Sequence, residues 1–457
     1  MAKTKSIYVC SNCGYTSTKW EGKCFGCGAW NTLEEKVISG ETPAEKKHKI
    51  WKGKNDIYAP SPVAIKDVQP GNTMRIKTGD NELDRVLGGG IVPGSLILIG
   101  GQPGIGKSTL LLQTALNLDK KVLYVSGEES EEQIKMRADR LSKRQDATYV
   151  LSENNLTNIL KEAKDMQAQL LIIDSIQTTY SPFLDSTPGT ISQIRECTTE
   201  ILRFAKETGI PVFIVGHITK EGAIAGPKLL EHIVDVVIQF EGDRNYNYRI
   251  LRTQKNRYGS TDELGIYEMT QLGLKNVENP SELLLSQSEE YFPGSTVAAT
   301  IEGQRAMLIE TQALVSTAIY GTPQRSATGF DLRRLNMILA ILEKRAGLYF
   351  GQKDVFLNIA GGLKITDPAI DLAIIAALVS SLEDTAIPKN ICFAGEISLT
   401  GEIRPVKNIL ARIKEADRLG FEKIFVSENN FKNLNTSDLN IEVISLKKIE
   451  ELIGYFF

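Results

Sequence analysis

The 457-residue chain lacks any apolar run of about 18 residues or more, the length that a membrane-spanning helix requires. It also begins without the apolar stretch of a secretory signal, so we expect a cytoplasmic protein with no membrane partner. Cysteine is scarce, and two of the 6 residues, Cys197 and Cys392, stand alone in apolar segments, which suits a reducing compartment. The net charge of −3 excludes a uniformly basic protein, so any contact with nucleic acid must come from local basic patches.

One stretch has the pattern of a phosphate-binding loop, Gly-x4-Gly-Lys-Ser, between an expected strand and an expected helix. In such loops backbone N–H groups cradle a triphosphate, the lysine reaches the β- and γ-phosphates, and the serine hydroxyl binds Mg²⁺. We therefore predict ATP and Mg²⁺ as cofactors. The residues expected to hold the nucleotide are consecutive: Gly101, Gln102, Pro103, Gly104, Ile105, Gly106, Lys107, Ser108 and Thr109.

Polar residues follow several of the apolar segments between residues 69 and 272, where strands are expected to alternate with helices. Because the carboxyl ends of parallel strands converge on one crevice, Glu128, Asp174 and His217 are expected to join the phosphate-binding loop. We predict that Asp174 holds Mg²⁺ through water and that Glu128 orients the attacking water, with Glu129 as the alternative. His217 is a candidate sensor of the γ-phosphate or, alternatively, a core histidine.

A basic segment follows the apolar strand expected at residues 248–251. Lys255 and Arg257 project to one side if this segment is extended. A cationic pair at such a corner is able to reach the γ-phosphate held by a neighbouring subunit and to stabilise charge in the transition state. A solvated basic turn is the alternative.

Four cysteines have the spacing of a zinc ribbon: Cys10-x2-Cys13 and Cys24-x2-Cys27, separated by ten residues and each followed by glycine. Four thiolates prefer tetrahedral Zn²⁺, and a module of about 35 residues needs the metal to supply folding energy. Two disulfides are the alternative, and the target of the module, DNA or protein, is left open. The two tryptophans of the module are expected to pack over the site.

A lysine-rich stretch around Trp51, between the zinc module and residue 69, is either a solvated tether or an interaction segment. The last part of the chain, from about residue 285, is expected to form an α+β domain. Residues 393–406 resemble the proteolytic domain of Lon proteases, which use a Ser–Lys dyad. The position of the nucleophile falls at Ala369 and that of the lysine at Leu410. Because neither side chain supports acyl transfer, we predict a non-proteolytic scaffold rather than a protease.

In combination, these motifs resemble the bacterial RadA (Sms) family of DNA-repair proteins. The resemblance is carried by the two Cys-x2-Cys-Gly knuckles and by residues 103–111, 125–130 and 255–259, and it covers nearly the whole chain. It implies a RecA-like ATPase that forms a hexameric ring similar to DnaB-type helicases. It also implies binding to single-stranded and branched DNA, and branch migration of recombination intermediates alongside the RecA recombinase.

The resemblance also assigns roles by position. Glu128 matches the catalytic glutamate of RecA-like proteins, and His217 occupies the place of their glutamine sensor. Lys255 and Arg257 match a signature pentapeptide that usually reads Lys-Asn-Arg-Phe-Gly, in which Tyr258 replaces the phenylalanine. The phosphate-binding loop more often has aspartate where this chain has glutamine, a change that leaves ATP binding intact.

Two polar loops, at residues 178–184 and 219–228, correspond in order to the DNA-binding loops of RecA-like rings. Lys220 and Lys228 would contact phosphates, and Tyr180 or Phe183 would stack on bases; ordinary surface loops are the alternative.

The predicted fold class is α/β, and we expect four segments in chain order. They are a zinc-finger module at 1–35, a linker at 36–68, a RecA-like ATPase domain at 69–272, and a Lon-protease-like domain at 285–457. The predicted function is a DNA-dependent ATPase motor with helicase or branch-migration activity in recombinational repair. The alternative is an ATP-gated repair scaffold that does not translocate.

Overall fold

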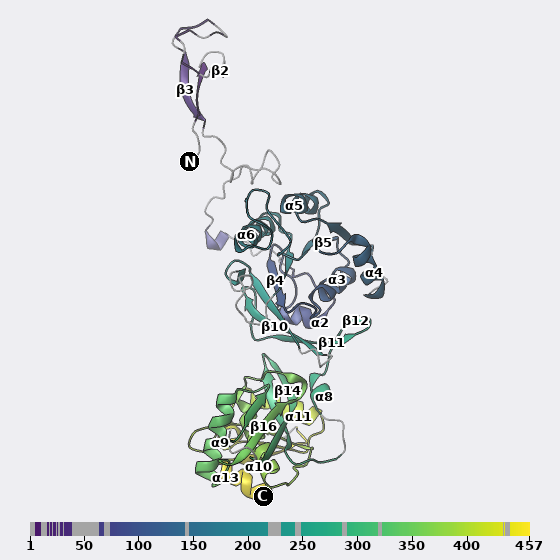
Figure 1. The fold of residues 1–457 in the computed structure, drawn as a ribbon, viewed down its shortest axis with the longest axis vertical. Coiled ribbons are helices and arrows are strands. Elements are labelled where there is room, and N and C mark those ends of the chain that lie inside the picture. The colour runs from purple at the N-terminus through teal and green to yellow at the C-terminus, as the bar shows by residue number, and fades with distance from the viewer. Residues whose placement is uncertain are drawn as a thin grey trace.

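The computed structural model describes most of the chain beyond residue 73 and parts of the N-terminal module (Figure 1). The described residues are 5–10, 16–17, 19–20, 22–23, 25, 28–30, 32–38, 64–67, 74–141, 146–217, 230–242, 248–285, 290–318, 322–432, 434 and 439–457. Along the long axis of Figure 1, a small N-terminal sheet is followed by a large central sheet and then by a second large sheet.

The N-terminal sheet has the order β2-β1-β3 and is antiparallel. Its strands are β1 (Lys5–Cys10), β2 (Thr16–Ser17) and β3 (Leu33–Ile38). Trp20 and Trp30 are 57% and 70% exposed. The cysteine side chains over which they are expected to pack lie outside the described residues, so that expectation stays a prediction. A short 3-10 helix, η1 (Ile65–Asp67), precedes the central sheet.

The central sheet has nine strands among the described residues, in the order β12-β11-β10-β9-β4-β8-β7-β5-β6. The strands from β9 to β6 in that order are parallel, and β10, β11 and β12 continue the sheet as antiparallel strands. The strands are β4 (Leu96–Gly101), β5 (Val122–Ser126), β6 (Thr148–Ser152), β7 (Leu170–Asp174), β8 (Val212–His217), β9 (Val236–Glu241), β10 (Tyr248–Asn256), β11 (Leu264–Thr270) and β12 (Gly273–Asn276). The sheet thus runs past residue 272.

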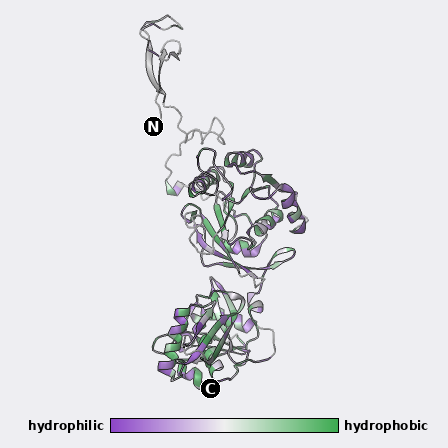
Figure 2. Ribbon diagram, viewed as in Figure 1, coloured by the Kyte–Doolittle hydropathy of each residue, from purple (hydrophilic) through white to green (hydrophobic). Residues whose placement is uncertain are grey.

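Helices cover both faces of this sheet, as the near-continuous apolar strands require. One face packs on α2 (Asn81–Val86), α3 (Lys107–Asn117) and α4 (Glu131–Leu141). The other face packs on α5 (Leu156–Asp165) and α6 (Ile191–Thr208). Green, apolar ribbon runs through the strands and along the inner sides of these helices in Figure 2.

The C-terminal sheet has the order β15-β16-β14-β13-β17-β20-β21. Its strands are β13 (Ser295–Glu302), β14 (Arg305–Thr317), β15 (Arg325–Thr328), β16 (Lys353–Ile359), β17 (Ile391–Ala394), β20 (Lys423–Ser427) and β21 (Glu442–Leu446), and a separate ribbon joins β18 (Glu396–Ile397) to β19 (Ile403–Arg404). The helices are α8 (Pro280–Leu284), α9 (Leu332–Ala346), α10 (Asp371–Leu382), α11 (Ile409–Arg418), α12 (Glu428–Phe431) and α13 (Ile449–Phe456), with 3-10 turns η2 (Ala360–Gly362) and η3 (Pro368–Ile370).

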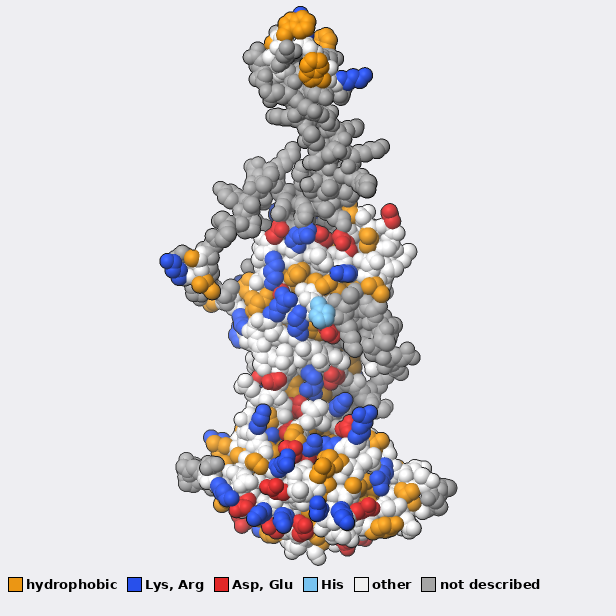
Figure 3. Space-filling view, turned by 90° about the vertical axis from the view of Figure 1, so that its left-hand side faces the viewer, with side chains coloured by type: hydrophobic (Ala, Val, Ile, Leu, Met, Phe, Trp, Pro, Cys, Tyr) orange, Lys and Arg blue, Asp and Glu red, His pale blue; other side chains and the backbone are white. Residues whose placement is uncertain are grey.

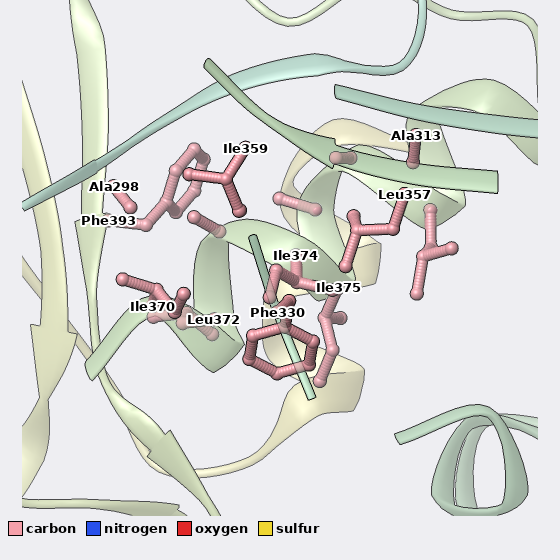
Figure 4. Packing of buried hydrophobic residues seen from close by; sticks show 14 of the residues in the cluster. Ala298, Ala313, Phe330, Leu357, Ile359, Ile370, Leu372, Ile374, Ile375 and Phe393 are labelled. Atoms are coloured by element: carbon pink, nitrogen blue, oxygen red, sulfur yellow. The ribbon is translucent and has the colours of Figure 1, made fainter. Parts of the chain in front are cut away.

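The core of this second unit is built around α10, in which residues 371–380 are all buried. Figure 4 shows Leu372, Ile374 and Ile375 of this helix beside Phe330, with Leu357 of β16 and Phe393 of β17 in the same cluster. α11 packs with a separate cluster that contains Cys392 and Ala369. Mixed parallel and antiparallel strands with helices on both sides agree with the predicted α+β domain.

The two large units touch at the β13–β14 hairpin. A Cβ on Gly303, whose φ is +68°, would lie 1.9 Å from the Asp262 carbonyl oxygen, so the turn lies directly on the central unit. Arg305 pairs with the buried Glu82 of α2, and Arg252 of β10 pairs with Glu302 at 3.0 Å. These charged contacts fix the hairpin against the central sheet. No helix within the described residues combines the length and the apolar character needed to cross a bilayer.

Candidate active site

The loop between β4 and α3 is shaped to accept phosphate. Gly106 is the N-cap of α3 with φ +118°, and no side chain caps the first N–H groups of the helix. A Cβ on Gly101 would lie 2.8 Å from the Phe240 carbonyl oxygen, and one on Gly106 would lie 2.8 Å from the Met269 methyl. The glycines are therefore required by close packing, and the uncapped helix N-terminus points its N–H groups and partial positive charge at the loop.

Lys107 is buried at the start of α3, with 4% of its surface exposed. Its Nζ donates to the carbonyl oxygens of Gly101 at 2.8 Å and Gln102 at 2.9 Å. Burial lowers the pKa of Lys107 to about 8, and the charges of Asp174 and Glu128 partly oppose that shift. Loop, lysine and both carboxylates thus lie in one place, and the donor set fits a nucleotide phosphate with Mg²⁺.

Two serines shape the turn after β5 and hold the Glu128 carboxylate. β5 and β7 are neighbours with Ser126 opposite Asp174. The Ser126 hydroxyl accepts the N–H of Glu128 at 3.3 Å and that of Glu129 at 3.0 Å, which shapes the turn after β5. Ser175 Oγ donates to Glu128 Oε1 at 3.0 Å. The Glu128 carboxylate is therefore directed toward the end of β7, beside Asp174.

Glu129 points elsewhere. Its carboxylate forms an ion pair with Arg137 of α4, with Oε2 2.6 Å from the guanidinium. Arg137 also donates to the hydroxyl of Tyr124 at 3.4 Å, and that hydroxyl donates to Asp174 Oδ2 at 2.7 Å. Tyr124 and Arg137 were not predicted, since a tyrosine in an apolar strand and an arginine on a polar helix carry no distinctive pattern.

The remaining predicted ATP-site and DNA residues are placed only in part. His217 is the last residue of β8, opposite Gly101 of β4, and its side chain lies outside the described residues. Lys220 and Lys228 also lie outside them. Tyr180 is half-buried and forms an isolated bridge with Asn155, and Phe183 is 38% exposed on the loop after β7.

Lys255 and Arg257 lie at the other end of the central sheet from the phosphate-binding loop, by the amino ends of β9 and β4. β10 continues to Asn256 through a bulge, so Lys255 belongs to the strand, and Arg257 lies in the bend directly after it. Lys255 Nζ donates to the carbonyl oxygens of Glu231 at 2.5 Å and Val234 at 2.8 Å. Arg257 lies 3.4 Å from Asp235, which precedes β9. Both cations thus contact the segment that leads into β9.

Asp235 organises that edge. It is 1% exposed, its Oδ2 accepts the N–H of Leu96 at the start of β4, and Lys206 of α6 pairs with it at 2.7 Å. Lys206 also donates to the hydroxyl of Tyr258 at 2.8 Å, so the residue that replaces phenylalanine has a polar partner here. Figure 3, which faces this side of the molecule, shows Lys and Arg side chains gathered near a histidine over the central unit.

The structure describes the residues of the protease prediction but not the cysteine side chains of the zinc prediction. Cys13, Cys24 and Cys27 lie outside the described residues, as does the side chain of Cys10. In the C-terminal unit Ala369 is fully buried and Leu410 is 40% exposed. The two lone cysteines, at positions 197 and 392, are buried and form no disulfide within the described part of the chain, as expected.

The comparisons with known proteins cover every part of the chain. The family model described as "AAA domain" matches residues 59–223, "Rubredoxin metal binding domain" matches residues 8–35, and "Subunit ChlI of Mg-chelatase" matches residues 310–430. The DNA repair protein RadA of Bacillus subtilis is 48% identical over 456 residues, which are 99% of each chain. That of Pseudomonas aeruginosa is 44% identical over 460 residues, which are 100% of each chain.

Among solved structures, the RadB recombinase is 24% identical, with a TM-score of 0.37, over 44% of this chain and 100% of that one. The family matches confirm the predicted order of a zinc ribbon, a RecA-like P-loop ATPase core and a C-terminal α+β domain of the Lon type.

Proposed function

Because the chain belongs to the RadA family of DNA repair proteins, we propose that it is a DNA-dependent ATPase motor that binds single-stranded and branched DNA. In this proposal it promotes branch migration of recombination intermediates alongside the RecA recombinase. A part in DNA repair and an ATP-hydrolysing domain follow from the family and the AAA match. The proposal adds the coupling of hydrolysis to movement on DNA.

The ATP site supports hydrolysis by one defined set of groups. The loop N–H groups and Lys107 bind the β- and γ-phosphates, Ser108 and Asp174 hold Mg²⁺, and His217 senses the γ-phosphate. Mg²⁺, when bound, neutralises charge on the phosphate oxygens. Glu128 orients the attacking water, since its carboxylate lies beside Asp174, whereas that of Glu129 is held by Arg137.

The proposal rests on the positions of two charged sites. The phosphate-binding loop lies at the carboxyl ends of the parallel strands, and Lys255 and Arg257 lie at their amino ends. The phosphate-binding loop follows the carboxyl end of β4, whereas Asp235 bonds to the amino end of the same strand and Arg257 lies against Asp235. β4 has 6 residues, which at about 3.3 Å each span roughly 17–20 Å. Lys255 and Arg257 are thus far from the nucleotide site of their own subunit, which supports our proposal that they act on the nucleotide of a neighbouring subunit.

A ring of such subunits, hexameric in our proposal, would carry the loop after β7 and the loop after β8 toward its centre. Tyr180 and Phe183 on the first loop would stack on bases, and Lys220 and Lys228 on the second would contact phosphates. Phe183 is partly exposed, which agrees with this role.

The test is ATP turnover with and without single-stranded oligonucleotide, measured together with the particle mass in the presence of ATP. We expect DNA to raise turnover, and the assembled ring to be required for it. Turnover that is the same in monomers and indifferent to DNA would contradict the proposal. Strand displacement on a forked duplex, abolished by Lys107→Ala, separates the motor from the alternative scaffold, which would bind the fork without opening it.

The zinc ribbon and the C-terminal domain complete the proposal. The match to a metal-binding domain supports one Zn²⁺ on Cys10, Cys13, Cys24 and Cys27, which elemental analysis of the wild type and of Cys13→Ser would test. The C-terminal domain serves as an assembly scaffold, and we expect no ATP-stimulated cleavage of casein. A cytoplasmic location stays a prediction.

A further inference from the structure

A fully buried tyrosine lies one hydrogen bond away from the proposed metal-binding carboxylate. Tyr124 is in the middle of β5, has 0% of its surface exposed, and donates its hydroxyl proton to Asp174 Oδ2 over 2.7 Å. Its ring packs in the cluster beneath α3 and α4, where it needs no hydroxyl to fill space. A buried hydroxyl in such a cluster is costly unless it is paired, so its pairing with this particular carboxylate calls for an explanation.

A second contact sets the direction of the hydroxyl proton. Arg137 Nη2 lies 3.4 Å from the Tyr124 oxygen, and a guanidinium can only donate. The hydroxyl therefore accepts from Arg137 and gives its own proton to Asp174.

The two carboxylate oxygens of Asp174 have different surroundings. Oδ2 is held by Tyr124, and Oδ1 makes no hydrogen bond to another side chain within the part of the chain that the structure describes. Asp174 is the last residue of β7, which lies two strands from β4 in the parallel part of the sheet, so its carboxylate is at the same end of the sheet as the phosphate-binding loop. A carboxylate held by one oxygen keeps a single orientation and presents the other to a ligand.

We propose that Tyr124 is a positioning residue for the Mg²⁺ site, and that its hydroxyl orients Asp174 toward the hydrated metal. The inference rests on the proposed role of Asp174 in holding Mg²⁺. Because Tyr124 would act through Asp174, its effect should appear in the dependence on Mg²⁺ rather than in nucleotide binding without metal.

The test compares two buried tyrosines of the same domain. Tyr124→Phe removes the hydroxyl that binds Asp174. Tyr267→Phe is the matched control, because Tyr267 is also 0% exposed and its hydroxyl donates to an aspartate, Asp80, over 3.0 Å at the N-cap of α2. The full-length variants are titrated with Mg²⁺ while binding of a fluorescent, non-hydrolysable ATP analogue is followed, and unfolding temperatures are measured without nucleotide.

We expect Tyr124→Phe to raise the Mg²⁺ concentration for half-maximal binding by about tenfold, the usual effect of losing a partner of a metal ligand. Binding of the analogue in EDTA should be unchanged, and Tyr267→Phe should keep the wild-type Mg²⁺ dependence even if its unfolding temperature falls. A wild-type Mg²⁺ titration for Tyr124→Phe, or an equal shift in both variants, would overturn the inference.

A third variant separates this inference from the proposal beneath it. Asp174→Asn should raise the Mg²⁺ concentration for half-maximal binding more than Tyr124→Phe does. If Asp174→Asn shifts the titration and Tyr124→Phe does not, the positioning role alone is wrong. If Asp174→Asn leaves the titration unchanged, the assignment of Asp174 to Mg²⁺ is wrong, and the role of Tyr124 is overturned with it.

Discussion

Lys107 of the central sheet and Arg412 of the C-terminal sheet are both buried cations, with 4% and 3% of their surfaces exposed, but their partners differ. Lys107 contacts backbone carbonyl oxygens, and no carboxylate of the described residues lies within ion-pair distance of it. Arg412 forms an ion pair with Asp367 at 2.5 Å and also donates to the Ala299 carbonyl oxygen. One buried cation still needs an anion, whereas the other already has one.

This difference agrees with the proposal that the central unit binds a phosphate ligand and that the C-terminal unit is an assembly scaffold. Asp367 and Arg412 lie two residues from Ala369 and Leu410, the positions that correspond to the Ser–Lys dyad of Lon. Asp367 also accepts from the Thr300 hydroxyl and from the N–H of Ile301, so its charge is fully engaged in structure. Residues close in sequence to the two dyad positions therefore form a satisfied ion pair, whereas Lys107 of the phosphate-binding loop has only backbone partners among the described residues.

The largest expected effect concerns the two neighbouring glutamates of the ATP site. Glu128→Gln should lower ATP hydrolysis by about 10³-fold and leave ATP binding intact, because it removes the group that orients water. Single-turnover hydrolysis and equilibrium binding measure the two quantities.

Glu129→Gln is the matched control, since Glu129 pairs with Arg137. It should retain most of the activity. A larger loss of ATP hydrolysis with Glu129→Gln than with Glu128→Gln would show that Glu129, not Glu128, orients the attacking water.

The next effect concerns the buried ion pair between Arg412 and Asp367 in the C-terminal unit. Arg412→Met leaves Asp367 buried without its partner and should lower the free energy of unfolding by about 3–5 kcal/mol. Chemical denaturation of the full chain, followed by a probe in the C-terminal domain, measures this. Adding Asp367→Leu to the same chain should recover part of the loss, because no unpaired charge is then buried.

The control is an exposed ion pair of the same helix. Arg418→Ala removes a pair with Glu415 in which the arginine is 52% exposed, and it should cost less than about 1 kcal/mol. Equal destabilisation by Arg412→Met and Arg418→Ala would show that burial of the Arg412 pair has no special weight.

A smaller effect follows from the pKa of Lys107, which burial lowers to about 8. Below pH 8 the amine of the nucleotide-free protein is charged, and affinity for ATP should vary little through this group. Above pH 8 the amine is neutral and must gain a proton to pair with phosphate, so the dissociation constant should rise about tenfold per pH unit. Lys107→Ala should bind weakly and lose this dependence, and a wild-type affinity that is flat from pH 7 to 9.5 would contradict the interpretation.

The smallest effect concerns DNA. Lys220→Ala combined with Lys228→Ala should weaken binding to single-stranded DNA and reduce the slope of log affinity against log salt by about 0.7 for each phosphate that the variant no longer neutralises. A titration at several salt concentrations measures the slope. An unchanged slope would remove both lysines from the DNA-binding surface.

Much of the ATP site was predictable because its chemistry is local in sequence. Asp174, expected at the carboxyl end of an apolar strand, is the last residue of β7, and the phosphate-binding loop connects β4 to α3 as expected. Tyr124, Arg137 and Ser126 escaped prediction, since their contacts depend on how β5, α4 and β7 pack together. The basic segment at residues 253–259 was expected to follow its strand, and pairing with β9 made residues 253–256 part of β10 instead.

By itself the sequence determined which groups are available for chemistry: a glycine-rich loop with its lysine, acidic residues at the ends of apolar strands, and no nucleophile at position 369. Those properties depend only on residue type and spacing, because they involve residues that are close together in the sequence. Only the tertiary structure decided which buried charges are satisfied. It paired Asp367 with Arg412, turned Glu129 toward Arg137, and placed Arg257 a strand's length from the phosphate-binding loop, because these partners come from separate elements of the fold.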